Sequence, residues 1–216
     1  MRYTSLFFDL DDTLYPNSTG LWEMIRQRMS QYMLERLKLP SEKVPGMRKQ
    51  YYETYGTTLR GLQIHHSVDP DDYLAFVHDL PLEEYLQPQP ELRKILLSLP
   101  QCRWIFTNAD AEHAQRVLSV LGLEDCFAGT IDIRATHFTC KPEIQAYQYA
   151  LAFAGEQIAQ SCGLFDDSLV NLRAAKGLGF RTVLINLNGQ TDPVVDLSLT
   201  SLFDLPEEMP ELWEII

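Results

Sequence analysis

Short apolar runs alternate with amphipathic segments along most of the chain. The runs that are short enough to be strands span 3–10, 102–108, 129–133, 162–167 and 181–187. Helices are predicted between the later strands, at 91–99, 111–121, from Pro142 to about 154, and 168–177. Strands that alternate with helices predict a parallel sheet covered on both faces. We therefore expect an α/β fold with a doubly wound, Rossmann-like sheet of five strands.

The segment between the first strand and the others has a different pattern. Apolar residues recur in it at helical spacing, at Leu21, Ile25, Met29, Tyr32, Met33 and Leu37. They predict a helix over about 20–38 that is capped by Thr19. Further helices are expected at about 41–55 and 70–79, and a turn at 56–62, before prolines punctuate the return to the sheet. The sequence thus predicts two domains, a core of 1–15 with 87–216 and a helical insertion of 16–86.

Polar residues follow three of the predicted strands at the points where these strands end. In chain order they are Asp9, Thr107, Asn108, Asp166 and Asp167. In open α/β sheets, ligands bind beyond the carboxyl ends of the strands. We therefore expect these side chains to meet in one crevice, although many tens of residues separate them along the chain.

Three carboxylates are crowded after the first strand, at Asp9, Asp11 and Asp12. Such crowding becomes tolerable when a divalent cation lies among them, and hard cations such as Mg²⁺ prefer oxygen ligands. One ion shared with the second acidic pair would account for both clusters. The predicted Mg²⁺ ligands are therefore Asp9, Asp11, Asp166 and Asp167.

The same residues fit phosphoryl transfer, in which positioning and charge neutralisation supply most of the catalysis. Asp9 would attack phosphorus and form an aspartyl-phosphate. Asp11 would protonate the leaving oxygen and then activate the water that resolves the intermediate. Lys141 would stabilise the phosphoryl oxygens, and Thr107 would offer a hydroxyl.

Four short motifs, "DLDDT", "FTNA", "CKP" and "FDDS", follow one another in this order. In order and spacing they resemble motifs I to IV of the haloacid dehalogenase-like hydrolases, and the resemblance covers nearly the whole chain. It implies that Asp9 is the nucleophile and that Asp11 is the acid/base, whose main-chain oxygen also binds Mg²⁺. It also implies that Thr107 is a phosphate ligand and that Lys141 is the motif III lysine. It implies that Asp167 binds the metal directly, and that Asp166 either binds the metal directly or contacts a residue that does. By the same resemblance, the main chain of Asn108 lies where motif II binds phosphate, and 16–86 is a helical C1 cap.

The residue two positions after the nucleophile separates two branches of this family. The dehalogenase branch lacks an aspartate there and works without magnesium, whereas this chain has Asp11. A phosphatase is therefore favoured over a 2-haloacid dehalogenase. A catalytically inert phosphate-binding protein is expected to lose Asp9, Asp11 or Lys141, and all three are present.

Two stretches of the cap, "LYPNSTGLW" and "YGTTLRGLQIHH", are similar to a subgroup of pyrimidine 5′-nucleotidases. This resemblance implies a nucleoside monophosphate substrate, UMP or CMP. The cap residues that it nominates for contacts to base or sugar are Tyr55, Arg60, Leu62 and His65. Phosphoglycolate, a sugar phosphate and lysophosphatidate are the alternative substrates.

Purely structural interpretations stand beside these roles. Asp9 and Asp11 could belong to a solvated turn, and Asp166 and Asp167 could cap the helix that starts at 168. Asp12 is expected to brace its loop, because successive side chains diverge.

Residues outside the acidic clusters have such alternatives too. Thr13 is expected to orient the aspartate loop by hydrogen bonding, and Arg60 could form a surface ion pair. The adjacent histidines His65 and His66 are not expected to bind a metal, because neighbouring side chains point in different directions on most backbones. Cys140 is expected to be a buried structural cysteine.

Composition and charge argue against some classes of partner. The chain has 216 residues, 45% hydrophobic and 22% charged, with a formal net charge of −12, which argues against nucleic acid or an anionic membrane as partner. No apolar run approaches the roughly 20 residues that cross a bilayer, and acidic residues interrupt any N-terminal signal sequence. Four cysteines without CxxC spacing indicate neither disulfides nor structural zinc. We therefore expect a cytoplasmic protein that acts on a small phosphorylated metabolite, with its oligomeric state left open.

Overall fold

The computed structural model describes residues 3–186, 188–189 and 191–214. The chain divides into two compact units, Met1–Pro16 with Leu86–Ile216, and Asn17–Tyr85. The boundaries expected from the sequence lie one residue away from these. The first unit holds the sheet and the second is helical.

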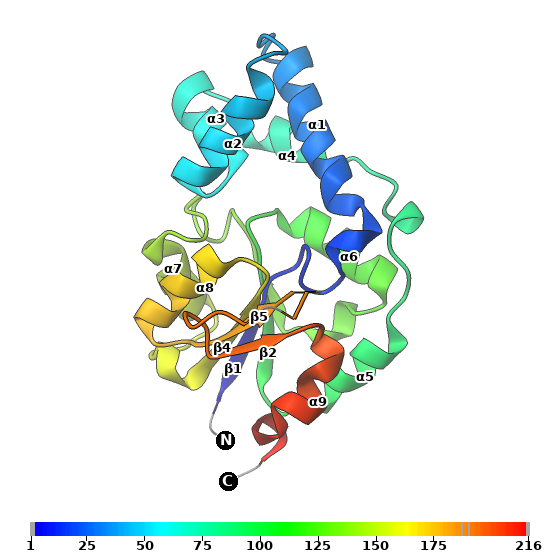
Figure 1. Ribbon diagram of the computed structural model, residues 1–216, viewed down its shortest axis with the longest axis vertical. Helices are drawn as coiled ribbons and strands as arrows, with labels where there is room; N and C mark the ends of the chain where they lie inside the picture. Colours follow the sequence, from blue (N-terminus) through cyan, green and yellow to red (C-terminus); the bar gives the residue numbers. More distant parts are fainter. Residues whose placement is uncertain (1–2, 187, 190, 215–216) are drawn as a thin grey trace. The chain divides into compact units, whose positions relative to one another are not determined.

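The sheet lies at the centre of the first unit (Figure 1). Within the described residues its strands are β1 (Ser5–Phe8), β2 (Cys102–Phe106), β3 (Gly129–Ile131), β4 (Cys162–Asp166), β5 (Arg181–Ile185) and β6 (Leu197–Leu199). They are ordered β3-β2-β1-β4-β5-β6, and every pairing is parallel. The predicted doubly wound α/β fold is confirmed. The predicted number of strands, five, was wrong, because the sheet has six in the described part of the chain. The sixth strand, β6, has only three residues without periodicity and is defined by its pairing with β5.

Helices cover both faces of this sheet. They are α5 (Pro90–Ser98), α6 (Ala111–Leu121), α7 (Ile144–Phe153), α8 (Leu169–Leu178) and the short α9 (Leu205–Glu208). Figure 1 shows α7 and α8 on one side of the strands, and α5, α6 and α9 on the other. Short 3₁₀ turns complete the unit, at Glu124–Cys126, Ala159–Ser161, Leu202–Asp204 and Pro210–Trp213.

An aromatic cluster fixes the central strands. The ring of Phe7 in β1 makes edge contacts with Phe106 of β2 and with Phe180, at centroid distances of 6.4 and 5.8 Å. Tyr147 of α7 packs edge-on against Phe106 at 5.5 Å. All four side chains are buried. Because close-packed interiors are rigid, the strand ends above this cluster are held in place.

The second unit consists of four helices. They are α1 (Leu21–Glu35), α2 (Val44–Tyr55), α3 (Thr58–His66) and α4 (Pro70–His78), with 3₁₀ turns at Asn17–Thr19 and Leu82–Glu84. Buried apolar residues of α1, such as Leu21, Ile25 and Met33, lie on one face as the helical spacing predicted. No helix in the part of the chain that the structure describes is long and apolar enough to cross a membrane.

Two local predictions for this unit were wrong. The stretch 56–62 is not a turn: Gly56 ends α2 with a left-handed φ of 82°, and Thr57 then caps α3 by accepting a hydrogen bond from the Arg60 amide. The capping position of α1 belongs to Gly20, which has a φ of 83°, although the hydroxyl of the preceding Thr19 accepts from the Leu21 amide at 3.4 Å. In both cases a glycine with positive φ reverses the chain, which an apolar pattern does not register.

Candidate active site at the carboxyl ends of the central strands

The three central strands bring the predicted residues to one edge of the sheet. β1 lies between β2 and β4, with Phe8 opposite Ile105 and Phe165. Asp9 follows directly and continues the ladder, because its amide donates to the Phe165 carbonyl at 2.8 Å. Asp9 and Asp166 are therefore neighbours although 157 positions separate them in the sequence.

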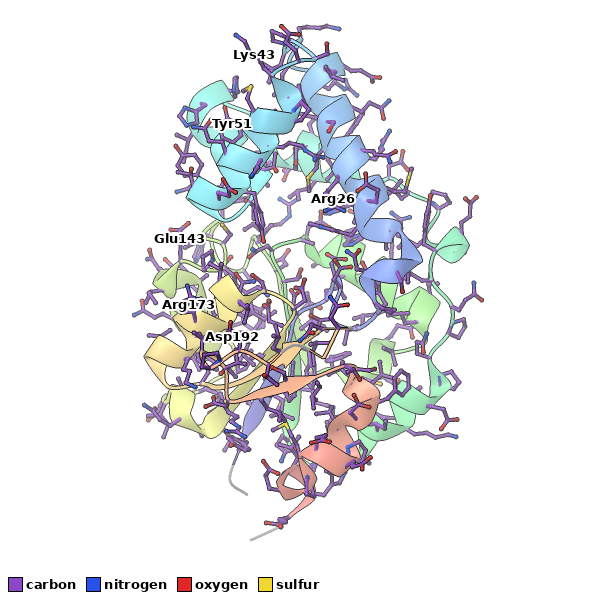
Figure 2. All side chains as sticks on the ribbon, viewed as in Figure 1. Arg26, Lys43, Tyr51, Glu143, Arg173 and Asp192 are labelled. Carbon is purple, nitrogen blue, oxygen red and sulfur yellow. The ribbon has the colours of Figure 1, made fainter. Side chains whose placement is uncertain are left out.

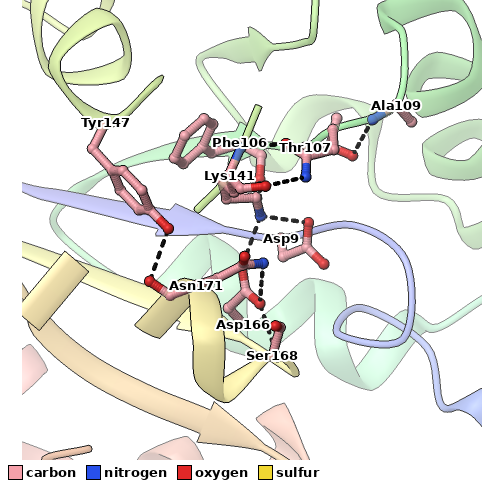
Figure 3. Close-up of polar contacts among 10 residues, drawn as sticks. Asp9, Phe106, Thr107, Ala109, Lys141, Tyr147, Asp166, Ser168 and Asn171 are labelled. Carbon is pink, nitrogen blue, oxygen red and sulfur yellow. Dashed lines mark hydrogen bonds and ion pairs between the residues drawn. The ribbon is translucent and has the colours of Figure 1, made fainter. Parts of the chain in front are cut away.

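Lys141 is the centre of the site (Figure 3). Its Nζ donates to Asp9 Oδ1 at 2.8 Å, to Asp166 Oδ2 at 2.7 Å and to the Phe106 carbonyl at 2.8 Å. The side chain is only 1% exposed. A buried ammonium is tolerated when charged partners surround it, and here its three donors all have an acceptor.

Asn108 holds the backbone of this lysine. The Lys141 amide donates to Asn108 Oδ1 at 2.8 Å, and Asn108 Nδ2 donates to the Lys141 carbonyl at 3.0 Å. The neighbouring Thr107 is buried, and its hydroxyl oxygen accepts from the Ala109 amide at 3.0 Å. The structure thus gives the Asn108 side chain a positioning contact that the sequence did not indicate, whereas phosphate binding by 107–108 stays a prediction.

Asp166 and Asp167 differ in their surroundings. Asp166 is fully buried and accepts from Lys141, from the Ser168 amide at 2.9 Å, and from Asn171 Nδ2 at 3.0 and 3.2 Å. Asp167 is exposed. The alternative of a helix cap holds in part for Asp166, because it binds the Ser168 amide at the start of α8.

The carboxylates are close enough to share a cation. One oxygen each of Asp9, Asp166 and Asp167 lies within 4.8 Å of the others. Burial raises the pKa of Asp9 to about 7, assisted by the charges of Asp166 and Asp11 and opposed by Lys141. Desolvation and the charges of Asp166, Asp9 and Asp12 raise the pKa of Asp167 to about 9. An oxygen cluster whose negative charge exceeds the single positive charge of Lys141 fits Mg²⁺.

Lys141 alone does not neutralise this cluster. Burial by itself would lower its pKa, but Asp166 and Asp9 more than offset this effect and raise the pKa above its ordinary value. The lysine is therefore a permanent cation among several carboxylates. A further divalent ion would offset the remaining repulsion.

Asp11 turns its carboxylate toward two residues that the sequence analysis missed. His113 Nε2 lies 3.1 Å from Asp11 Oδ1, and the Tyr15 hydroxyl donates to the same oxygen at 2.5 Å. A signal for His113 was present: it lies on the buried face of α6 with Val117 and Leu121, at helical spacing. A histidine on an otherwise apolar face needs a polar partner.

Two expectations for the aspartate loop have different outcomes. Asp12 has a left-handed φ of 61°, a conformation that aspartate tolerates, so it turns the loop after β1. The Thr13 hydroxyl is buried without a hydrogen-bond partner among the described residues. The expected orienting hydrogen bond from Thr13 is therefore not found.

The cap candidates lie on α2 and α3. Tyr51, labelled in Figure 2, stacks on His65 with centroids 5.4 Å apart and bonds His66 Nε2 at 2.9 Å. The Tyr55 hydroxyl pairs with His65 Nε2 at 2.8 Å. Both histidines thus have tyrosine partners. Leu62 is fully buried, whereas His65 is exposed. The burial of Leu62 does not favour a direct contact between its side chain and a ligand. Ligand contacts of Tyr55, Arg60 and His65 stay predictions.

Fold and site together define a Rossmann-like α/β protein with a cluster of charged residues at the carboxyl ends of its central strands. A sequence model of the haloacid dehalogenase-like hydrolases matches residues 3–179. The chain therefore belongs to this family of hydrolases.

A curated yeast protein is similar to most of this chain. Phosphate metabolism protein 8 of Saccharomyces cerevisiae is 30% identical over 192 residues, which cover 82% of this chain and 60% of the yeast protein. The chain thus spans less than two thirds of the length of that relative.

Solved structures share the fold. The HAD-hydrolase YfnB of Bacillus subtilis, bound to magnesium, has a TM-score of 0.63 at 17% identity, with full coverage of both chains. A HAD phosphatase of Thermococcus onnurineus has a TM-score of 0.63 at 20% identity, over 94% of this chain and 96% of its own. The L-2-haloacid dehalogenase of Xanthobacter autotrophicus has a TM-score of 0.61 at 18% identity, over 97% and 99%. Since phosphatase and dehalogenase are equally similar, the fold does not choose between the two reactions.

Mg²⁺ should stabilise the protein more at high pH than at low pH. The pKa values of Asp9 and Asp167, about 7 and about 9, lie above their ordinary value of 3.8. The folded state therefore binds more protons than the unfolded state between these pKa values. The contribution of the two groups to stability is lost as the pH rises from the unfolded pKa of 3.8 through the folded pKa values of about 7 and about 9. Bound Mg²⁺ would replace the protons. The rise in Tm on adding Mg²⁺ should therefore be about 5 °C larger at about pH 8 than at about pH 5.

Thermal melts with and without Mg²⁺ at both pH values measure this difference. Asp167→Asn should shrink the Mg²⁺-dependent shift, because it removes one ligand and one raised pKa. A shift of equal size at both pH values in the unaltered protein would contradict the prediction.

Proposed function

We propose that this protein is a Mg²⁺-dependent phosphomonoester hydrolase that works through an aspartyl-phosphate. The observation that carries the proposal is the pair Asp9 and Asp11. Asp9 is held at the end of β1 by Lys141 at 2.8 Å, and an acid suited to protonate a leaving group follows two residues later. A dehalogenase has no need of that acid, whereas an alkoxide leaving group does.

Lys141, Asp9 and Asp11 have different roles in the proposed reaction. Lys141 binds Asp9 Oδ1 and thereby orients Oδ2 for attack on phosphorus. Asp11 donates a proton to the leaving oxygen as its bond to phosphorus breaks, and the product alcohol departs. Asp11 then accepts a proton from the water that attacks the aspartyl-phosphate, which releases inorganic phosphate and restores Asp9.

The metal would be held by Asp9, Asp167 and the main-chain oxygen of Asp11, with Asp166 beside them. When bound, Mg²⁺ would offset the negative charge of nucleophile and phosphate. Asp166 itself is already bound by Lys141 and Asn171. It therefore suits a supporting position that links the lysine to the ligand cluster.

The proposed substrate is a pyrimidine nucleoside 5′-monophosphate, UMP or CMP. Support comes from the similarity of "LYPNSTGLW" and "YGTTLRGLQIHH" to pyrimidine 5′-nucleotidases. The aromatic and histidine side chains of α2 and α3 offer stacking surfaces and hydrogen-bond donors of the kind that bases and sugars need. The yeast relative is named for phosphate metabolism, in line with a phosphate-releasing reaction.

A substrate panel with and without Mg²⁺ tests the proposal. We expect phosphate release from UMP and CMP to exceed that from purine nucleotides, phosphoglycolate, sugar phosphates and lysophosphatidate, and EDTA to abolish it. A strong peak on another phosphomonoester would overturn the nucleotidase assignment alone. Halide release from 2-haloacids without any phosphate release, or full activity in EDTA, would overturn the phosphatase itself.

A further inference from the structure

Asp11 has one oxygen to which two side chains are directed. The Tyr15 hydroxyl lies 2.5 Å from Oδ1, and His113 Nε2 lies 3.1 Å from the same atom. Tyr15 and His113 are 3% and 1% exposed, and the Asp11 side chain is 14% exposed. The two partners are thus buried, whereas the carboxyl group they hold reaches the surface of the site.

Independent contacts fix the histidine in this position. His113 lies in the first turn of α6, where its amide donates to the Asp110 carboxylate at 2.7 Å. Asp132, at the end of β3, anchors the same helix start by accepting from the Ala111 amide at 2.9 Å. All of these residues belong to the sheet unit. The arrangement therefore does not depend on where the helical unit lies.

The shared oxygen determines where Asp11 carries its proton. A carboxylate oxygen can only accept, so both Tyr15 and His113 Nε2 must donate when they bind it. Two donors on Oδ1 favour it as the carbonyl oxygen of the neutral acid and place the acidic hydrogen on Oδ2. A fixed choice of oxygen is what a general acid needs, because the proton must be aimed at the leaving atom.

We propose that Tyr15 and His113 are positioning residues that hold Asp11 through Oδ1, so that Oδ2 delivers the proton to the leaving group. The inference rests on the proposed phosphatase function and assigns two residues to it. In the step concerned, the bond from Asp9 Oδ2 to phosphorus forms and the bond from phosphorus to the leaving oxygen breaks. The proton of Asp11 Oδ2 passes to that oxygen and leaves Asp11 as a carboxylate.

The test compares two substrates that differ in their need for an acid. An alkyl phosphate leaves as a basic alkoxide and needs the proton, whereas p-nitrophenyl phosphate leaves as a stable phenolate and hardly needs it. The ratio kcat/KM reports transfer to Asp9 and not the later hydrolysis. For Tyr15→Phe we expect kcat/KM on the alkyl ester to fall about tenfold and on the aryl ester less than about threefold.

Matched variants separate positioning from a general structural effect. Tyr32→Phe is the control, because Tyr32 is also 3% exposed and also donates to an aspartate, Asp72 Oδ2 at 2.8 Å, in the helical unit. It should leave the ratio of the two substrates unchanged. His113→Gln, which keeps an N–H donor, should retain more alkyl-ester activity than His113→Leu.

Each outcome decides between the inferences. Equal loss on both substrates in Tyr15→Phe and His113→Leu, or no loss in either, would overturn the positioning roles while leaving the phosphatase intact. Failure of the unaltered protein to release phosphate from either ester with Mg²⁺ would overturn the proposed function and this inference together. Selective loss on the alkyl ester in either variant, with Tyr32→Phe unaffected, supports the assignment.

Discussion

Asp9→Asn is expected to lower the steady-state rate of phosphate release by about 10⁴-fold or more. The amide has nearly the shape of the carboxylate, and its oxygen can still accept from Lys141 Nζ, so the site should stay assembled. What is lost is a carboxylate oxygen able to form a bond to phosphorus. Phosphate release from the substrate that the panel identifies, under saturating Mg²⁺, measures the effect.

A second readout tests the covalent step directly. After acid quenching, the unaltered protein should carry phosphate on Asp9, and Asp9→Asn should carry none. Asp196→Asn is the matched control, because the Asp196 carboxylate also accepts from a lysine, Lys176 Nζ at 2.9 Å, and takes no part in the candidate site. Turnover that survives in Asp9→Asn while Asp196→Asn behaves normally would rule out the covalent mechanism.

Lys141→Met has the second largest expected effect, on activity and stability together. The variant removes the cation that contacts Asp9, Asp166 and the Phe106 carbonyl, and it leaves two acidic groups without their shared partner. Removing one partner of a buried ion pair costs about 3 kcal/mol or more in the free energy of unfolding. Loss of a group that stabilises the transition state should lower kcat by about 10³-fold.

Measuring Lys141→Met both with Mg²⁺ and in EDTA makes this prediction more specific. Because the ion can compensate part of the unpaired charge, the loss of stability should be larger in EDTA than with Mg²⁺, whereas the loss of kcat should persist. Lys176→Met is the control: Lys176 also bonds an aspartate, Asp196 at 2.9 Å, but is 40% exposed, so both losses should be small. If Lys141→Met matched Lys176→Met in stability and rate, the buried lysine would have neither role.

The sequence indicated the acidic site because the relevant information is local. Asp9 and Asp166 each follow a short apolar run, and parallel strands all present their carboxyl ends at one edge. Lys141 was recognisable only as part of an ordered set of motifs, since a single lysine before a proline carries no such information. The pattern of apolar residues likewise located α1 and α6, because a face buried over several turns repeats in the sequence.

Other features depend on residues that no local pattern connects. The three-residue strand β6 exists because β5 offers it an edge, and α3 exists because Gly56 reverses the chain. His113 is 102 positions from Asp11. Asn108 is 33 positions from the Lys141 backbone that it binds. Contacts of this kind become visible only when the strands have brought the elements together.

The amino-acid sequence by itself thus determined the order of the first five strands and of most helices, the identity of the charged groups and the family. Hydrophobic periodicity and short motifs are properties of neighbouring residues, so they can be read without coordinates. Tertiary structure alone decided that Lys141 bridges Asp9 and Asp166, that Asn108 holds Lys141, and that Tyr15 and His113 share one oxygen of Asp11. Hydrogen bonds form over about 3 Å and require particular directions, so they depend on how distant segments pack together.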